Sequence, residues 1–391
     1  MRRVGIALVM WLTLPGLVPP AAAQETLRDA LGVLMTSQAV QTSDFERDRA
    51  AADAARDTIA RALLVNLTSA PITTSSGGFV YRLRPELGTV ERASESFGTL
   101  FVERALTAGA GAFSFGAAAS TASYDRLNGF SLEDGSLVTV ANRFRDETQP
   151  FDTDSITMHL RASTITWFAN YGVTDHFDLG VAVPIARVSF DGQRVNVYRD
   201  RSIVQATASG TSSGLADIAI RAKYALVTGS YGAIAAAGEV RLPTGDEENL
   251  LGAGSMSWRV LAVASLEHGP LSAHANGGVV RGGVSDETTM SGAVSVALHP
   301  RVTFTTELAE RRVSELRGFV LSGAPHPTIA GVDTFRLLSD AASTTLVTAV
   351  TGLKWNVTDT LVLGGHLLWS VRDRGLKAPL TPAITFEYSV Q

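Results

Sequence analysis

The sequence contains no cysteine among its 391 residues. It therefore forms no disulfide, holds no metal through thiolates and carries no lipid on a cysteine. Charged residues are scarce, at 18%, and the net charge of −5 is spread along the chain without a basic patch. Nucleic acid is therefore not an expected partner. A chain of this kind needs another source of stability, and a closed network of strands would supply it.

Long apolar runs are missing after residue 18. A helix that crosses a membrane needs about 20 consecutive apolar residues, so the sequence excludes helical membrane spans. A short apolar run does open the chain, from Val4 to Val18, behind two arginines. The small residues of a cleavage site follow it, ending at Ala23. This order predicts a signal peptide over 1–23, export, and a mature chain that begins at Gln24.

The next segment, 24–76, differs from everything after it. Leu27, Leu31 and Leu34 recur at helical spacing, and an S-x-x-E capping box at Ser43 begins a second, charged amphipathic helix over about 44–65. A linker rich in serine, threonine and glycine follows. We predict a short helical N-terminal segment that serves either as a plug inside a barrel or as a periplasmic spacer.

From Phe79 onward the apolar pattern has a period of two. Phe177, Leu179 and Val181 alternate with more polar or smaller residues, and the segment from Leu361 behaves in the same way. Successive side chains of a strand point to opposite faces, so each strand has one apolar and one more polar face. Many of these segments exceed the roughly 5–6 residues of a globular strand and reach the roughly 9–11 that span a bilayer.

Short and long connections alternate along this region, as they do in outer-membrane barrels. The longest connections are predicted at 127–153, 191–212 and 314–342. We therefore predict an all-β fold over 77–391: an antiparallel transmembrane β-barrel of about fourteen strands. Twelve is the alternative, because the first two strands, 78–86 and 95–106, are the least regular. The predicted location is the outer membrane of a Gram-negative-type bacterium, with its lipid and its outer-membrane assembly machinery as partners.

The polar face of the strands is expected to line the lumen, because charge that faces lipid is costly. Residues of both signs occur there, which supports either a lattice of cross-strand salt bridges or a permeation path with charged rings. The predicted lumen-lining residues are His159, Arg161, Asp217, Arg221, Lys223, Glu239, Arg241, Glu307, Arg311, Lys354, His366 and Glu387.

No motif for catalysis or for a cofactor stands out. Ser212 lies in a G-x-S-x-G match, but the match opens a predicted strand, whereas a hydrolase elbow leads into a helix. The acidic loop 242–252 could hold a divalent cation, although solvated charge explains it more simply. The seven histidines show no metal-binding spacing. We predict no catalytic residue, no cofactor, no metal and no enzyme activity.

Two stretches carry a resemblance to a known family. Residues 96–107, Ser-Phe-Gly-Thr-Leu-Phe-Val-Glu-Arg-Ala-Leu-Thr, and 171–184, Tyr-Gly-Val-Thr-Asp-His-Phe-Asp-Leu-Gly-Val-Ala-Val-Pro, resemble outer-membrane barrels assigned to transport in phenol meta-pathway degradation. Such barrels are similar to fatty-acid and toluene porins. The resemblance implies passive transport of small solutes of hydrophobic or aromatic character. Barrels of this kind usually end on an aromatic residue, whereas this chain ends on Gln391.

Two other functions stay open on the sequence: a structural or surface-interaction barrel without an open pore, and a barrel-embedded hydrolase that uses a serine such as Ser212. Conductance in planar bilayers separates them. If the N-terminal segment is a hatch, deleting 24–75 should raise the conductance of the refolded barrel. A structural barrel stays silent in both forms, and a hydrolase would instead show esterase activity that depends on its serine.

Overall fold

The computed structural model describes residues 26–36, 45–68, 78–84, 89–92, 94–314, 316, 318–340 and 343–390. The predicted signal peptide, the capping box at Ser43 and most of the linker lie outside these residues. The helices and strands are α1 (Leu27–Thr36), α2 (Phe45–Thr68), β1 (Tyr81–Arg84), β2 (Thr89–Arg92), β3 (Phe113–Tyr124), β4 (Arg126–Leu127), β5 (Phe130–Ser131), β6 (Leu137–Phe144), β7 (Asp152–Thr174), β8 (Phe177–Tyr198), β9 (Arg201–Leu215), β10 (Ala219–Thr228), β11 (Gly232–Arg241), β12 (Ser257–His268), β13 (Leu271–Gly282), β14 (Glu287–His299), β15 (Val302–Val313), β16 (Gly318–Pro325), β17 (Val332–Asp340), β18 (Thr344–Thr358), β19 (Leu361–Ser370), β20 (Leu376–Lys377) and β21 (Thr381–Val390).

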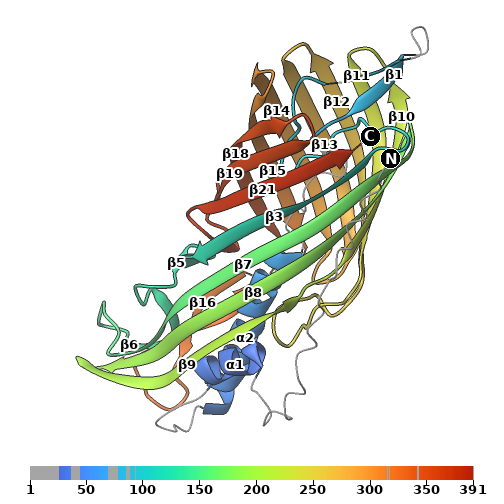
Figure 1. Cartoon of the computed structure of the whole chain (residues 1–391). Coiled ribbons are helices and arrows are strands. Elements are labelled where there is room, and N and C mark those ends of the chain that lie inside the picture. The colour runs from blue at the N-terminus through green and yellow to red at the C-terminus, as the bar shows by residue number, and fades with distance from the viewer. Residues whose placement is uncertain are drawn as a thin grey trace, which may run out of the picture.

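Twelve antiparallel strands of the described chain close into a barrel (Figure 1). Around the ring the order is β7-β3-β21-β19-β18-β15-β14-β13-β12-β11-β10-β8, and β8 pairs with β7 to complete it. A closed ring leaves no unpaired strand edge, which is the condition for strands to lie in a bilayer. The all-β antiparallel barrel is confirmed, with the smaller of the two predicted strand numbers.

The first two predicted barrel strands are wrong. In the segment 78–86, the described residues 78–84 contribute β1, which pairs with β2 in a separate hairpin. Residues 95–106 form no strand at all; they are mostly buried and follow an irregular path. Their apolar pattern arose because they are enclosed by other parts of the protein, whereas a barrel strand has one face toward lipid.

The outer face of the barrel is apolar. Trp167, Tyr224 and Leu353 are each about half exposed, and Ile384 is 66% exposed. In water such a belt of large apolar side chains would be unfavourable, whereas in a bilayer it meets hydrocarbon. Near the short-turn end, the rings of Phe115 and Tyr388 lie 5.6 Å apart, as in an interfacial aromatic girdle.

Within the described residues, neither helix has the length and apolar character needed to cross a membrane.

Strands β7 and β8, of 23 and 22 residues, run far beyond the barrel at the end with the long connections. There β9 pairs with β8, and β6, β17 and β16 continue the sheet from β7. Most residues of the three predicted long connections therefore lie in strands. We call the part of the sheet formed by the outer halves of β7 and β8 with β6, β9, β16 and β17 the sheet extension.

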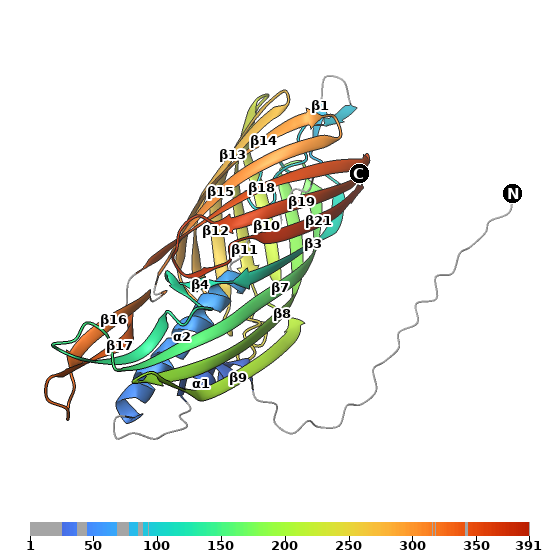
Figure 2. The ribbon, with the colours of Figure 1, turned by 90° about the vertical axis from the view of Figure 1, so that its left-hand side faces the viewer.

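Both helices pack on the sheet extension (Figure 2). Thr26 and Asp29 cap α1 reciprocally, and the hydrogen bonds from Thr26 lower the pKa of the Asp29 carboxyl. Leu27 and Leu34 approach Gly210 and Gly192, where an added Cβ would lie 2.6 Å and 2.8 Å from the leucine side chains. These two glycines therefore allow α1 to lie close against the strands.

The helices and residues 94–108 lie toward opposite ends of the barrel. Arg28 of α1 pairs with Glu247 and Glu248 in a long connection. Thr107, by contrast, donates a hydrogen bond to Asp175 in the short turn between β7 and β8. Because short turns of such barrels are periplasmic and long connections face outward, we expect the helices on the outer side of the membrane.

Cysteine labelling can test this placement, since the natural chain has no thiol. Asp57 of α2, whose side chain is 64% exposed, is the test position. In intact cells, D57C should react with a membrane-impermeant maleimide as fast as T148C in an exposed long connection. S230C, in a short turn, should react only after permeabilisation. If D57C behaves like S230C, the helices lie on the periplasmic side.

Candidate functional site

The lumen at the short-turn end is filled by residues 94–108, which we call the lumen plug. The plug has no regular secondary structure, so its peptide groups need other partners. The Glu307 carboxylate on β15 accepts hydrogen bonds from the backbone N–H groups of Leu100, Phe101 and Val102, the last two at 2.8 Å and 3.0 Å. One buried carboxylate thus accepts three hydrogen bonds that the carbonyl groups of a neighbouring strand would otherwise accept.

Further barrel side chains hold the plug along its length. The backbone N–H of Phe97 donates to Thr303 at 3.1 Å, and that of Ala105 donates to Ser265 at 2.9 Å. The N–H of Ala108 donates to both oxygens of Asp178 at 3.1 Å. The plug is therefore bonded to strands on different sides of the ring.

Two buried lysines bind the plug carbonyl groups. Lys354 Nζ donates to the backbone oxygens of Phe97 and Thr99, at 3.3 Å and 2.8 Å. Lys223 Nζ donates to those of Arg104 and Leu106, at 3.2 Å and 2.8 Å, and lies 3.4 Å from Asp178. Hydrogen bonds to charged groups are stronger than neutral ones, and more so away from water. These contacts give the plug a fixed position.

A bend inside the plug brings the side chain of Arg104, itself a plug residue, against the plug backbone. Gly98 has a φ of +74°, and a Cβ at this position would lie 2.7 Å from Arg104 Nη2. Only glycine fits that backbone conformation without strain. The Arg104 side chain is almost fully buried, and its Nη2 donates to the backbone oxygen of Ser96 at 3.3 Å. The guanidinium thus stabilises the bend.

A second group of predicted residues forms ion pairs in the lumen, further from the short turns. Glu239 accepts hydrogen bonds from Arg221 Nε at 2.9 Å and from Arg241 Nε at 2.7 Å. Glu287 takes both Nε and Nη2 of Arg311, at 2.9 Å and 2.8 Å. Arg259 is the register partner of Glu239 on the neighbouring strand. We call these six residues, which run from β10 to β15, the charge ladder: Arg221, Glu239, Arg241, Arg259, Glu287 and Arg311.

The remaining predicted residues take other roles. Glu387 accepts a hydrogen bond from the Gly78 N–H at 2.6 Å. Asp217 is buried and accepts from the N–H groups of Gly245 and Ala253, which fixes a long connection. His366 is buried on β19, and its ring nitrogens have no hydrogen-bond partner among the described residues.

His159 and Arg161 are corrections, because both lie on the outer face of the sheet. The His159 side chain is 75% exposed and lies 3.6 Å from Glu133. In the sheet extension the inner face of β7 is the apolar one, since Met158 and Leu160 pack there beneath the helices. The outer face of the sheet extension meets water. Polar residues of β7 therefore point outward there, whereas in the membrane they point inward.

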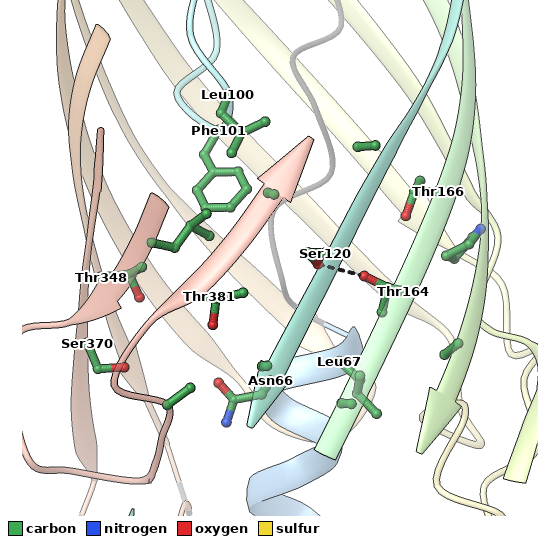
Figure 3. A pocket seen from close by; sticks show the side chains of 18 of the residues that line it. Asn66, Leu67, Leu100, Phe101, Ser120, Thr164, Thr166, Thr348, Ser370 and Thr381 are labelled. Atoms are coloured by element: carbon green, nitrogen blue, oxygen red, sulfur yellow. Dashed lines mark hydrogen bonds between the residues drawn. The ribbon is translucent and has the colours of Figure 1, made fainter. Parts of the chain in front are cut away.

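Between the lumen plug and the end of α2 lies a cavity of about 190 Å³ (Figure 3). Leu100 and Phe101 of the plug bound it on one side, and Asn66 and Leu67 of α2 bound it on the other. Ser120 and Thr164, on β3 and β7, share a hydrogen bond of 2.9 Å in its wall. The rest of the wall is largely small and apolar, with the following alanines: Ala118, Ala119, Ala122, Ala162, Ala186, Ala216, Ala309, Ala378 and Ala383. Two members of the charge ladder, Arg241 and Arg311, also reach it.

Sequence reasoning missed the plug, Arg259 and Glu287. The last two stand at inward positions of predicted strands, so the same parity that selected Glu239 could have selected them. One sequence signal could have indicated the plug. Residues 96–107 contain no clear in-and-out alternation, and turn-forming serines and glycines lie beside them. In the part of the chain that the structure describes, no group of three or more His, Asp or Glu residues is placed to hold a metal.

The hydrolase motif has a structural explanation. Gly210 gives Leu27 of α1 room to pack against β9. Ser212 is the register partner of Val188 on β8, within a regular ladder. The motif thus lies in a strand without the strand-to-helix turn that exposes a nucleophilic serine.

Residues 133–374 match the protein family described as "Putative MetA-pathway of phenol degradation". The match covers more than half of the chain. The chain belongs to this family. The predicted resemblance is confirmed by the match, which includes the hairpin of β7 and β8. No curated protein matches the sequence.

Several solved structures are similar in outline. The COG4313 outer membrane channel from Pseudomonas putida F1 has 10% identity over 73% of this chain and 97% of that chain, with a TM-score of 0.47. The KdgM porin has 10% identity over 61% and 99%, with a TM-score of 0.38. The NalP translocator domain from Neisseria meningitidis has 9% identity over 72% and 88%, with a TM-score of 0.37. The barrel fold of this family member follows from its own strand pairing.

The plug contacts predict what happens when the Glu307 carboxylate is removed. Glu307→Ala should leave three buried N–H groups without their acceptor, which costs about 1–3 kcal/mol for each unsatisfied group before relaxation. The plug should then move, and the refolded barrel should show more frequent conductance events in planar bilayers. Deleting 24–75 alone leaves residues 94–108 in place, so its effect should be smaller.

Glu310→Ala is the matched control, because Glu310 is exposed on the outer face of the same strand. It should conduct like the unaltered barrel. Identical traces from the Glu307 and Glu310 variants, with folding verified by heat-modifiable mobility, would contradict a plug held by Glu307.

Proposed function

We propose that this family member is a plugged outer-membrane channel for the passive passage of small apolar solutes, aromatic ones included, without an enzymatic step. The observation that carries the proposal is the cavity between the lumen plug and α2. An apolar cavity of about 150 Å³ is enough for a benzene ring, and this one is about 190 Å³ with a wall of mostly small, apolar side chains.

The arrangement of the two ends supports a channel that opens transiently. The plug closes the short-turn end through charged hydrogen bonds, and the C-terminal turn of α2 bounds the cavity on the other side. Inorganic ions would lose hydration along the largely apolar side of this cavity, which is costly. An apolar ring crosses the same chamber at little cost, so the lining itself selects among solutes.

A structural barrel is the second candidate, and the density of bonds to the plug favours it. If those bonds never open, the cavity is only a packing defect and no solute passes. The two candidates differ in what happens when the cavity is filled by a larger side chain.

Ala118→Phe places a ring into the cavity, whereas Ala117→Phe, one residue earlier on β3, points to the lipid face beside Phe115. Uptake of radiolabelled toluene should be measured in cells that carry equal amounts of each folded variant. A118F should lose most of the protein-dependent uptake, and A117F should keep it. Equal uptake by both variants would rule out passage through this cavity and leave the structural barrel.

A further inference from the structure

The apolar outer surface of the barrel ends along one line on strands β7, β8 and β9. Ile165, Ile185 and Leu215 are register partners across these strands, and each is at least 40% exposed. Side chains on one face of a strand recur every second residue, about 6.7 Å apart. At the next such position toward the sheet extension, all three strands carry a polar or charged residue. The lipid-facing surface therefore ends at this line.

Two rows of polar side chains follow directly beyond the apolar line. In each row an arginine lies between two serines of the neighbouring strands, and none of these residues is buried. The row members are Ser163, Arg187 and Ser213 in the first row, and Ser123, Arg161 and Ser189 in the second. The surface next to the lipid thus combines guanidinium groups with hydroxyl groups.

A third row carries the acidic side chains. Asp191 is the register partner of His159 in this row, and Glu133 lies 3.6 Å from the same histidine. The second and third rows line a groove of about 650 Å³ in the outer surface of the sheet. The cations therefore lie nearest to the apolar line, and the carboxylates lie further from the membrane.

The two arginines of these rows differ from other exposed arginines of the protein. Arg126, Arg145 and Arg281 each lie 2.9–3.7 Å from an aspartate. Within the described residues, Arg161 and Arg187 have neither an ion pair nor a hydrogen bond of their side chains. Arginines at a membrane border can reach water on their own, but that role does not require a flanking serine on each side. The arrangement is instead suited to an anion with further hydrogen-bonding groups.

We propose that this face binds the phosphorylated headgroup of a glycolipid in the outer leaflet. Arg161 and Arg187 hold its phosphates, because a guanidinium donates paired, charge-assisted hydrogen bonds to phosphate oxygens. The acyl chains lie against Ile165 and Ile185, in continuity with the lipid-facing surface. From the first row to the third the polar surface extends about 13 Å, further than a single phosphate reaches, which favours a sugar headgroup over a phospholipid.

The proposal concerns the outside of the barrel and does not depend on the proposed function. It does use the outward placement of the long connections, because that placement puts the arginine rows in the outer leaflet. The D57C labelling experiment tests this condition separately. Labelling that places the helices on the periplasmic side would overturn the proposal.

Native mass spectrometry of the detergent-solubilised full-length protein can compare three lipid probes: lipid A with two phosphates, the same lipid without phosphates, and phosphatidylglycerol. Lipid A with two phosphates should bind on the order of tenfold more tightly than either other probe, as the gain from charged hydrogen bonds implies. In the double variant R161Q/R187Q this preference should vanish, while the affinity for the phosphate-free lipid stays the same.

Two control variants separate recognition from overall charge and from folding. Arg201→Gln removes an exposed guanidinium from the far end of the same sheet, at the turn between β8 and β9, and should keep the full preference. The double variant R161K/R187K retains both charges and should keep part of it. A preference lost in R201Q would mean that the overall charge of the protein attracts the lipid, which would overturn the proposal.

The remaining outcomes also decide against the site. Equal binding of lipid A with and without phosphates would mean that the acyl chains alone are recognised. Equal binding of lipid A and phosphatidylglycerol would assign the arginines to phospholipid phosphate and overturn the glycolipid. An unchanged preference in R161Q/R187Q would place the recognition elsewhere. None of these results changes the expected toluene uptake of A118F, so the two proposals fail on different measurements.

Discussion

Every peptide group away from water needs a hydrogen-bond partner, and this demand shapes the whole protein. The barrel meets it by pairing its last strand, β21, with its first, β3, so that no strand edge is left in the membrane. The lumen plug meets it differently, because an irregular segment has no neighbouring strand. Carboxylates and ammonium groups take the place of strand partners, and the charges buried on β8, β10, β15 and β18 have this structural purpose.

The same demand explains the two kinds of charge in the lumen. Near the short turns, each charge is directed at the backbone of the plug, which fixes one segment in one position. Further from the short turns, the charge ladder pairs side chain with side chain, as in Arg221–Glu239 and Arg311–Glu287. Two residues of the ladder, Arg241 and Arg311, border the cavity beside the end of α2.

The sequence allowed the twelve barrel strands to be found, because in-and-out alternation follows directly from the bilayer on one side and the lumen on the other. The alternation was misleading in segments that do not lie between the bilayer and the lumen. Residues 95–106 are mostly buried inside the barrel, so their apolar content was taken for a strand although they lack clear alternation. His159 and Arg161 belong to the sheet extension, where water replaces lipid outside and apolar helices replace the polar lumen inside. The plug contacts join residues some 200 positions apart, as with Phe101 and Glu307, and no local pattern records such pairs.

The position of the plug in the chain has a consequence for assembly. The plug precedes every barrel strand in sequence, and the ring is sealed where the last strand, β21, pairs with the first, β3. Its partners include Thr303 and Lys354, which come late in the chain. A finished barrel would have to admit the plug through one of its ends, whereas an unfinished sheet can curl around it. The plug thus precedes in sequence every strand that surrounds it, so the wall can close around it when β21 pairs with β3.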